Sequence, residues 1–93
     1  MAEAKIVWIK PQDGGKKKIP PVGMMFYPMI KINTDEEIIN WSLVLINKEF
    51  NDVYETTAEM KFLMNNAPHC LLKSGIEFTL YEGAKKIAKG KIK

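Results

Sequence analysis

His69 and Cys70 are the pair of residues whose types could support nucleophilic catalysis or metal binding, since the chain holds one histidine and one cysteine. A cysteine nucleophile needs a base within hydrogen-bond reach, and neighbouring side chains of an extended segment point apart. A zinc site would need carboxylates to complete its three or four ligands. We therefore expect a loop histidine and a packed cysteine, no catalytic residue, no metal and no cofactor.

The lysines near the two ends of the chain form a second candidate group. All 14 basic side chains are lysine, which holds phosphate as a point charge but lacks the donor fork with which arginine reads guanine. A sequence-blind contact with an RNA backbone is therefore one interpretation, and a solvated strand face that resists aggregation is the other, which the missing arginines favour. The group comprises Lys16, Lys17, Lys18, Lys85, Lys89, Lys91 and Lys93.

Methionine and aromatic residues gather in a third candidate group. Methionines and aromatic side chains are enriched at protein interfaces, and packing on a core explains only every second residue of this run. The other half must meet another domain, another subunit or another protein, so we expect a protein-binding or self-association surface. The group comprises Met24, Met25, Phe26, Tyr27 and Met29.

Alternating apolar and polar residues indicate that strands position these groups. The strand segments are expected at residues 4–10, 24–32, 38–46, 57–64, 76–82 and 85–93. Residues 33–37 are expected to form a polar turn, 47–52 a connection, and the proline-rich residues 19–23 a rigid loop, while Pro28 indicates an edge or a bulge. No helix is expected.

Six short strands separated by turn residues favour an all-β fold, a small closed antiparallel β-barrel of about six strands, because closure removes the sheet edges. A Greek-key sandwich is the alternative. The 93 residues suffice for a single domain (1–93), and 46% hydrophobic with 27% charged residues is typical of a globular protein. With no signal-like or membrane-spanning apolar run, we expect a cytoplasmic protein without membrane contact.

Charge is distributed unevenly along the sequence. Residues 1–34 carry six lysines and two acids, residues 35–82 carry three lysines and nine acids, and residues 83–93 carry five lysines and no acid. If the first and last strands pair, the two basic ends would combine into one basic surface opposite an acidic one.

The C-terminal part carries a recognisable set of hairpin residues: Gly75, Ile76, Phe78, Leu80, Glu82, Gly83, Ile87 and Gly90. With this spacing it resembles the third, C-terminal barrel domain of translation elongation factor Tu. The N-terminal strand, glycine turn and proline-led run to Gly23 are compatible with that resemblance. The resemblance implies a stand-alone barrel. Because the chain lacks a phosphate-binding G-x-x-x-x-G-K-[ST] loop, no nucleotide and no GTPase chemistry are expected.

In that family the domain helps to hold the backbone of aminoacyl-tRNA and meets partner proteins, partly through a Glu-Gly-Gly-Arg turn. The turn here is Glu82-Gly83-Ala84-Lys85, so the resemblance adds Gly83 to the RNA-binding candidates while removing the arginine. We therefore expect a non-enzymatic binding module that presents a protein-interaction surface, and the resemblance implies a link to translation. The alternative is a module that binds tRNA or other RNA through its lysines.

Overall fold

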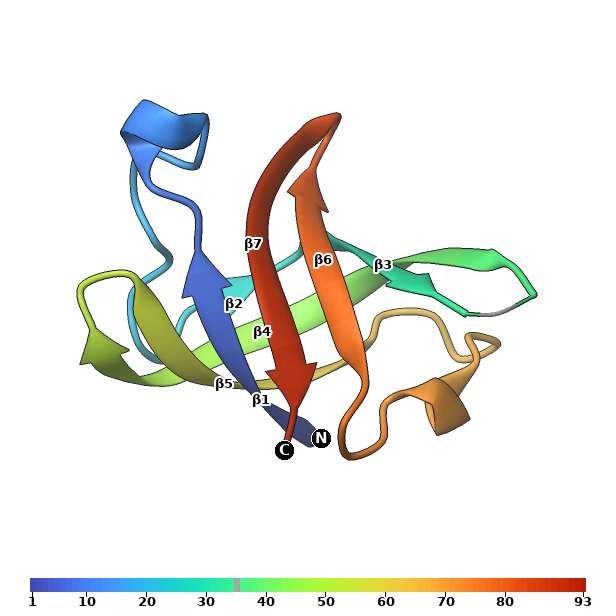
Figure 1. The fold of residues 1–93 in the computed structure, drawn as a ribbon. Helices are drawn as coiled ribbons and strands as arrows, with labels where there is room; N and C mark the ends of the chain where they lie inside the picture. The colour runs from blue at the N-terminus through green and yellow to red at the C-terminus, as the bar shows by residue number, and fades with distance from the viewer. Residues whose placement is uncertain (35) are drawn as a thin grey trace.

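The computed structural model describes residues 1–34 and 36–93, and these form seven strands and two short 3-10 helices (Figure 1). The helices are η1 (Pro11–Asp13) and η2 (His69–Leu71). The strands are β1 (Ala2–Trp8), β2 (Met25–Phe26), β3 (Met29–Asn33), β4 (Ile38–Asp52), β5 (Glu55–Phe62), β6 (Glu77–Glu82) and β7 (Lys85–Ile92).

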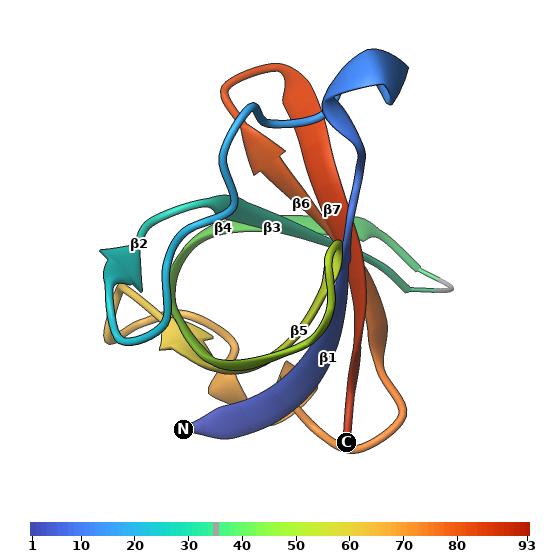
Figure 2. The same ribbon diagram turned by 90° about the vertical axis from the view of Figure 1, so that its left-hand side faces the viewer.

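Six of the strands close into an antiparallel barrel, which confirms the predicted fold class. The neighbours run β4-β3-β6-β7-β1-β5, and a further pairing of β5 with β4 closes the ring. Figure 2 shows the curved β4 and β5 completing one side of this ring. Closure leaves no open edge in the six-stranded ring itself, and β2 lies outside it on β4.

Strands β2 and β3 lie end to end along one edge of β4 in a common register. Met25 pairs with Ile46, and Met29 pairs with Ser42. Pro28 separates the two strands because its nitrogen has no hydrogen to donate, although its carbonyl still accepts a bond of 2.9 Å from the Leu43 amide. The expected strand 24–32 is therefore present, but it is broken at the proline.

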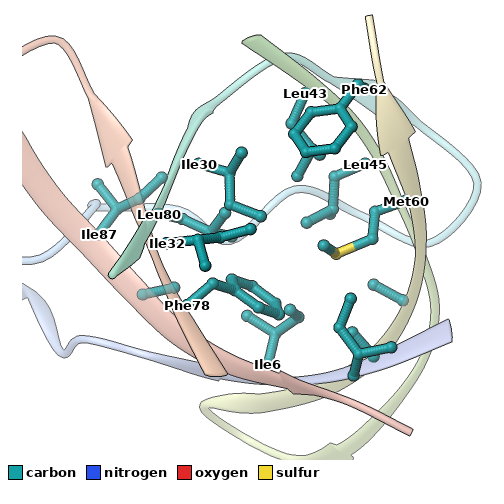
Figure 3. Packing of buried hydrophobic residues seen from close by; sticks show 14 of the residues in the cluster. Ile6, Ile30, Ile32, Leu43, Leu45, Met60, Phe62, Phe78, Leu80 and Ile87 are labelled. Carbon is teal, nitrogen blue, oxygen red and sulfur yellow. The ribbon is translucent and has the colours of Figure 1, made fainter. Parts of the chain in front are cut away.

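The interior of the barrel is filled by apolar side chains from all six strands (Figure 3). In β1, β3 and β6 every second side chain is buried, as the period of a half-buried strand requires. The central side chains shown in Figure 3 are Ile6, Ile30, Ile32, Leu43, Leu45, Met60, Phe62, Phe78, Leu80 and Ile87.

A chain of buried hydrogen bonds joins the long loop between β1 and β2 to the barrel. The Trp8 indole nitrogen donates to Thr56 Oγ1 (2.9 Å), and Thr56 Oγ1 donates to Asn47 Oδ1 (2.7 Å). Asn47 Nδ2 then donates to the Pro20 carbonyl (2.8 Å). Among the described residues, every buried side-chain nitrogen and oxygen atom has a hydrogen-bond partner. This chain of bonds therefore fixes the proline-rich loop without leaving its own side-chain groups unpaired.

Two sequence predictions about the middle of the chain need correction or completion. Residues 47–52 were expected to connect two strands, but β4 continues to Asp52, and register shifts at Lys48 and Asn51 bend it. In the expected turn 33–37, the Thr34 hydroxyl donates to the Glu37 carbonyl (2.8 Å). Asp35, which belongs to that turn, lies outside the described residues.

The two ends of the chain meet as expected. β1 pairs with β7, so that Ala4 lies opposite Ile92, and the Lys93 amide donates to the Glu3 carbonyl (2.9 Å). Figure 1 shows both termini at the same end of the barrel. In the part of the chain that the structure describes, no helix is long and apolar enough to span a membrane.

Candidate functional site

His69 and Cys70 lie together in η2, at the surface of the barrel. His69 Nε2 is 3.0 Å from the Asn65 carbonyl, and its ring packs edge-on against Phe62. Cys70 is exposed, so the prediction of a packed cysteine is wrong. Over residues 1–34 and 36–93, no group of three or more His, Cys, Asp or Glu side chains is arranged to hold a metal ion.

The outer face of β2, β3 and β4 carries a continuous group of apolar side chains. The alternation along β2 and β3 points Phe26 and Ile30 inward, whereas Met25, Tyr27 and Met29 point outward. We call this surface the apolar wall, and its outward side chains are Met25, Tyr27, Met29, Val44, Ile46 and Leu63.

Side chains of the apolar wall support one another. Val44 points away from the core, since it lies between the inward Leu43 and Leu45, yet only 5% of its surface is exposed. The Tyr27 hydroxyl donates to Met25 Sδ (3.4 Å). In contrast, Met25 and Tyr27 are each 58% exposed. The wall therefore has a buried residue, Val44, in register with more exposed methionine and tyrosine side chains.

Charged residues lie along one margin of the apolar wall. Ile46 pairs with Glu59 of β5, and Val44 pairs with Lys61 of the same strand. Glu59 also lies 3.9 Å from Lys48. An apolar centre beside a charged rim is the arrangement found at protein interfaces.

The remaining residues of the predicted protein-binding group, Phe26 and Met24, lie outside the apolar wall. Phe26 points inward and packs against Trp8, with a distance of 6.2 Å between the ring centres. The Lys16 amine lies 5.1 Å from the centre of the Phe26 ring. Met24 is exposed, and its amide bonds to the Pro21 carbonyl (3.2 Å) in the turn that precedes β2.

A second surface is a hollow of about 690 Å³ on the outer faces of β3, β6, β7 and β1. Two predicted RNA-binding residues, Lys89 and Lys91, line it. The other lysines that line it were not predicted. We call this surface the lysine hollow, and its lysines are Lys5, Lys31, Lys86, Lys89 and Lys91.

The composition of the lysine hollow depends on an irregularity in β7. Tyr81 pairs with Lys86, but Leu80 pairs with Ala88, so Ile87 is an extra residue in the ladder. Because of this bulge, the neighbouring residues Ile87 and Ala88 are both buried. After the bulge the outward side chains are at odd positions, such as Lys89, and before it the outward side chain is at an even position, Lys86. Consequently Lys86 lies on the same side of β7 as Lys89, whereas Lys85, which is also exposed, lies on the other side of the strand.

The other residues of the predicted RNA-binding group lie away from the hollow. Lys16 makes an ion pair of 3.0 Å with Glu82. Lys17 and Lys18 are exposed in the loop after η1. Gly83 has a φ of 63° in the turn between β6 and β7, where a glycine avoids the strain that a β-carbon would cause.

Comparisons with models of protein families, with curated proteins and with solved structures found no match. The chain is therefore assigned to no family, and its resemblance to the third domain of elongation factor Tu stays a prediction. The apolar wall and the lysine hollow consequently have to be interpreted from their own chemistry.

Alternation along single strands could have found part of each surface. The opposite orientation of Tyr27 and Phe26 follows from adjacent positions in one strand. Lys5 could have been found in the same way, because it alternates with the inward Ala4 and Ile6 of β1. Lys31 joins the hollow only because β3 pairs with β6, and no local pattern carries that information.

Proposed function

We propose that the chain is a non-enzymatic protein-binding module whose apolar wall docks on a complementary apolar protein surface. The observation that carries the proposal is the outward row of Met25, Tyr27 and Met29, which are all exposed. This row belongs to residues 19–30, a segment that contains no charged residue. Exposed apolar patches of this kind mark interaction sites. Methionine adapts its shape to a partner, and tyrosine supplies a rigid anchor with a polar end.

The resemblance to elongation factor Tu adds support of a different kind. In that family, neighbouring domains cover part of the third barrel. The same kind of surface on this barrel would suit a separate protein, and the resemblance points to a protein of the translation machinery as the partner class. The two forms that the proposal takes are a distinct partner protein and a second copy of this chain.

RNA-backbone binding by the predicted lysine group is the alternative, and the geometry supports it less. Lys16 is paired with Glu82, and Lys85 lies on the other side of its strand from Lys89. An RNA backbone would need a continuous positive track to follow. The predicted group is instead divided between the loop after η1, the turn and strand start at Gly83 and Lys85, the lysine hollow, and Lys93, which pairs with Glu3 (3.1 Å).

Photo-crosslinking tests the protein-binding proposal. An aromatic photo-crosslinker placed at Tyr27 should yield a defined protein adduct in cells that produce the chain, or a dimer of the purified chain. The matched control is the same crosslinker at Phe50, an exposed aromatic residue outside the wall. The adduct should form again when the purified chain is mixed with the purified partner protein. The double variant Met25→Lys/Met29→Lys should abolish the adduct. Equal labelling from both positions would overturn the proposal.

A further inference from the structure

Two lysines of the lysine hollow lie directly opposite each other. Lys5 of β1 pairs with Lys91 of β7, and both are exposed. Directly opposed side chains on one face have β-carbons about 4.5–5.5 Å apart, so like charges there are unfavourable. Folding therefore gathers positive charge at this point, which favours a bound anion.

A second row of donors crosses the hollow beside this pair. Lys31 pairs with Thr79, and Thr79 pairs with Lys89, so a threonine lies between two lysines in register on the outer face. On its other side Lys89 faces Val7 of β1, which carries no charge. This row offers hydrogen-bond donors and no carboxylate.

The acidic side chains in the hollow neutralise only part of its charge. Glu55 lies 3.5 Å from Lys5, and Glu77 pairs with Lys91 along the strands, without an ion pair. Five lysines against two glutamates leave a net charge of +3 in the lining. Among the described residues, Lys5 is the member of the group that makes an ion pair, so the other four lysines have no carboxylate partner there. The Lys31 amine lies 5.8 Å from the centre of the Tyr81 ring.

The size and charge of the hollow together indicate its ligand. A volume of about 690 Å³ lies within the range of small-molecule sites, roughly 300–1,000 Å³. A phosphate monoester carries a charge of about −1.5 to −2 at neutral pH, so two such groups match the net charge of +3. We propose that the lysine hollow binds a compact anion that carries two or more phosphate groups.

A compact anion fits better than a nucleic acid because the five lysines line one hollow, whereas the other basic residues of the predicted RNA-binding group do not line it. The apolar wall contributes no residue to the hollow. The proposal is therefore independent of the protein-binding function, and the failure of one leaves the other standing.

Isothermal titration calorimetry of the whole chain with inorganic tripolyphosphate, at about 50 mM and 200 mM salt, tests the proposal. We expect saturable one-to-one binding that weakens as salt screens the charges. Lys89→Gln and Lys91→Gln should each weaken it about tenfold, since each removes a charged donor. Lys85→Gln removes the same charge from the same strand outside the hollow, and it should change the affinity less than about twofold.

Three results would overturn the proposal. The first is no saturable binding of tripolyphosphate at the lower salt concentration. The second is an equal loss of affinity in Lys85→Gln and Lys89→Gln, which would indicate attraction to the overall positive charge. The third is a short single-stranded RNA that binds more than about tenfold more tightly than tripolyphosphate and whose binding is also weakened by Lys85→Gln. That result would mean that the lysines bind an RNA backbone.

Discussion

The ring of Phe78 lies against the backbone of Gly90, its cross-strand neighbour on the inner face of the β6–β7 hairpin. Ile6 of β1 flanks Gly90 on the other side. A β-carbon at Gly90 would overlap the tip of the Phe78 ring and would lie 2.9 Å from Ile6 Cδ1. The phenylalanine therefore fills the space that the glycine leaves, and the barrel can close tightly between β6 and β1.

We predict that Gly90→Ala destabilises the fold, although alanine normally favours a strand over glycine. The added methyl group would overpack the core, at a cost of about 1–3 kcal/mol in the free energy of unfolding. Urea denaturation of the wild type and the variant measures this difference. An unchanged or higher free energy of unfolding would contradict the prediction.

The matched control for that prediction is the double variant Phe78→Leu/Gly90→Ala. Leucine removes the ring atoms that the new methyl group meets, so Gly90→Ala should cost less in the Phe78→Leu background than in the wild type. A double-mutant cycle gives this coupling energy directly. Additive effects would mean that the strain arises elsewhere.

Much of the fold could be predicted because the alternation that identifies a strand lies within the sequence of that strand. The alternation of residues 57–64 and 76–82 located most of β5 and all of β6, and turn residues marked most connections. The continuation of β4 through Asn47–Asp52 was missed because two bulges interrupt the alternation where polar residues are frequent. A bulge carries one residue out of register, so a period-2 pattern does not survive it.

The apolar wall was more predictable than the lysine hollow, because alternation describes one segment and not the pairing of distant strands. Tyr27 and Met29 of the apolar wall belong to one short segment, and their orientation follows from alternation. The lysine hollow combines residues of five strands, including Glu55 of β5, and Lys86 joins it through the bulge at Ile87. The bond between Trp8 and Thr56 joins residues 48 apart in sequence, and no local pattern indicates such a partner.

Thr56→Val should destabilise the protein more than its small change in shape suggests. The substitution removes the oxygen that accepts from the Trp8 indole and donates to Asn47, leaving both groups buried without a partner. Each orphaned group costs about 1–3 kcal/mol in the free energy of unfolding. Thr56→Ser keeps the hydroxyl and is the control, so a loss as large as that of Thr56→Val in urea denaturation would contradict the argument.

Cys70 should react with Ellman's reagent in the folded protein, because the residue is exposed in η2. We expect one thiol to be labelled in a single kinetic phase, at a rate that does not change when urea is added below the unfolding transition. Cys70→Ser should change the free energy of unfolding by less than about 0.5 kcal/mol. Labelling that required unfolding would show that the thiol is packed in solution.

Tyr27→Lys should separate the binding role of the apolar wall from its part in folding. Tyr27 is 58% exposed, so the substitution should change the free energy of unfolding by no more than about 0.5 kcal/mol. The loss of an aromatic anchor at the centre of an interface should weaken binding of the crosslinked partner, or self-association, by about tenfold or more. Sedimentation velocity and a binding titration measure these effects.

Phe50→Lys supplies the comparison, because Phe50 is 45% exposed and lies outside the wall. Both variants add one positive charge and remove one exposed aromatic ring. If the two variants weaken association equally, general charge repulsion explains the effect. If Tyr27→Lys alone weakens it while both variants unfold at the same urea concentration as the wild type, the contact belongs to the surface that Met25, Tyr27 and Met29 form above Val44.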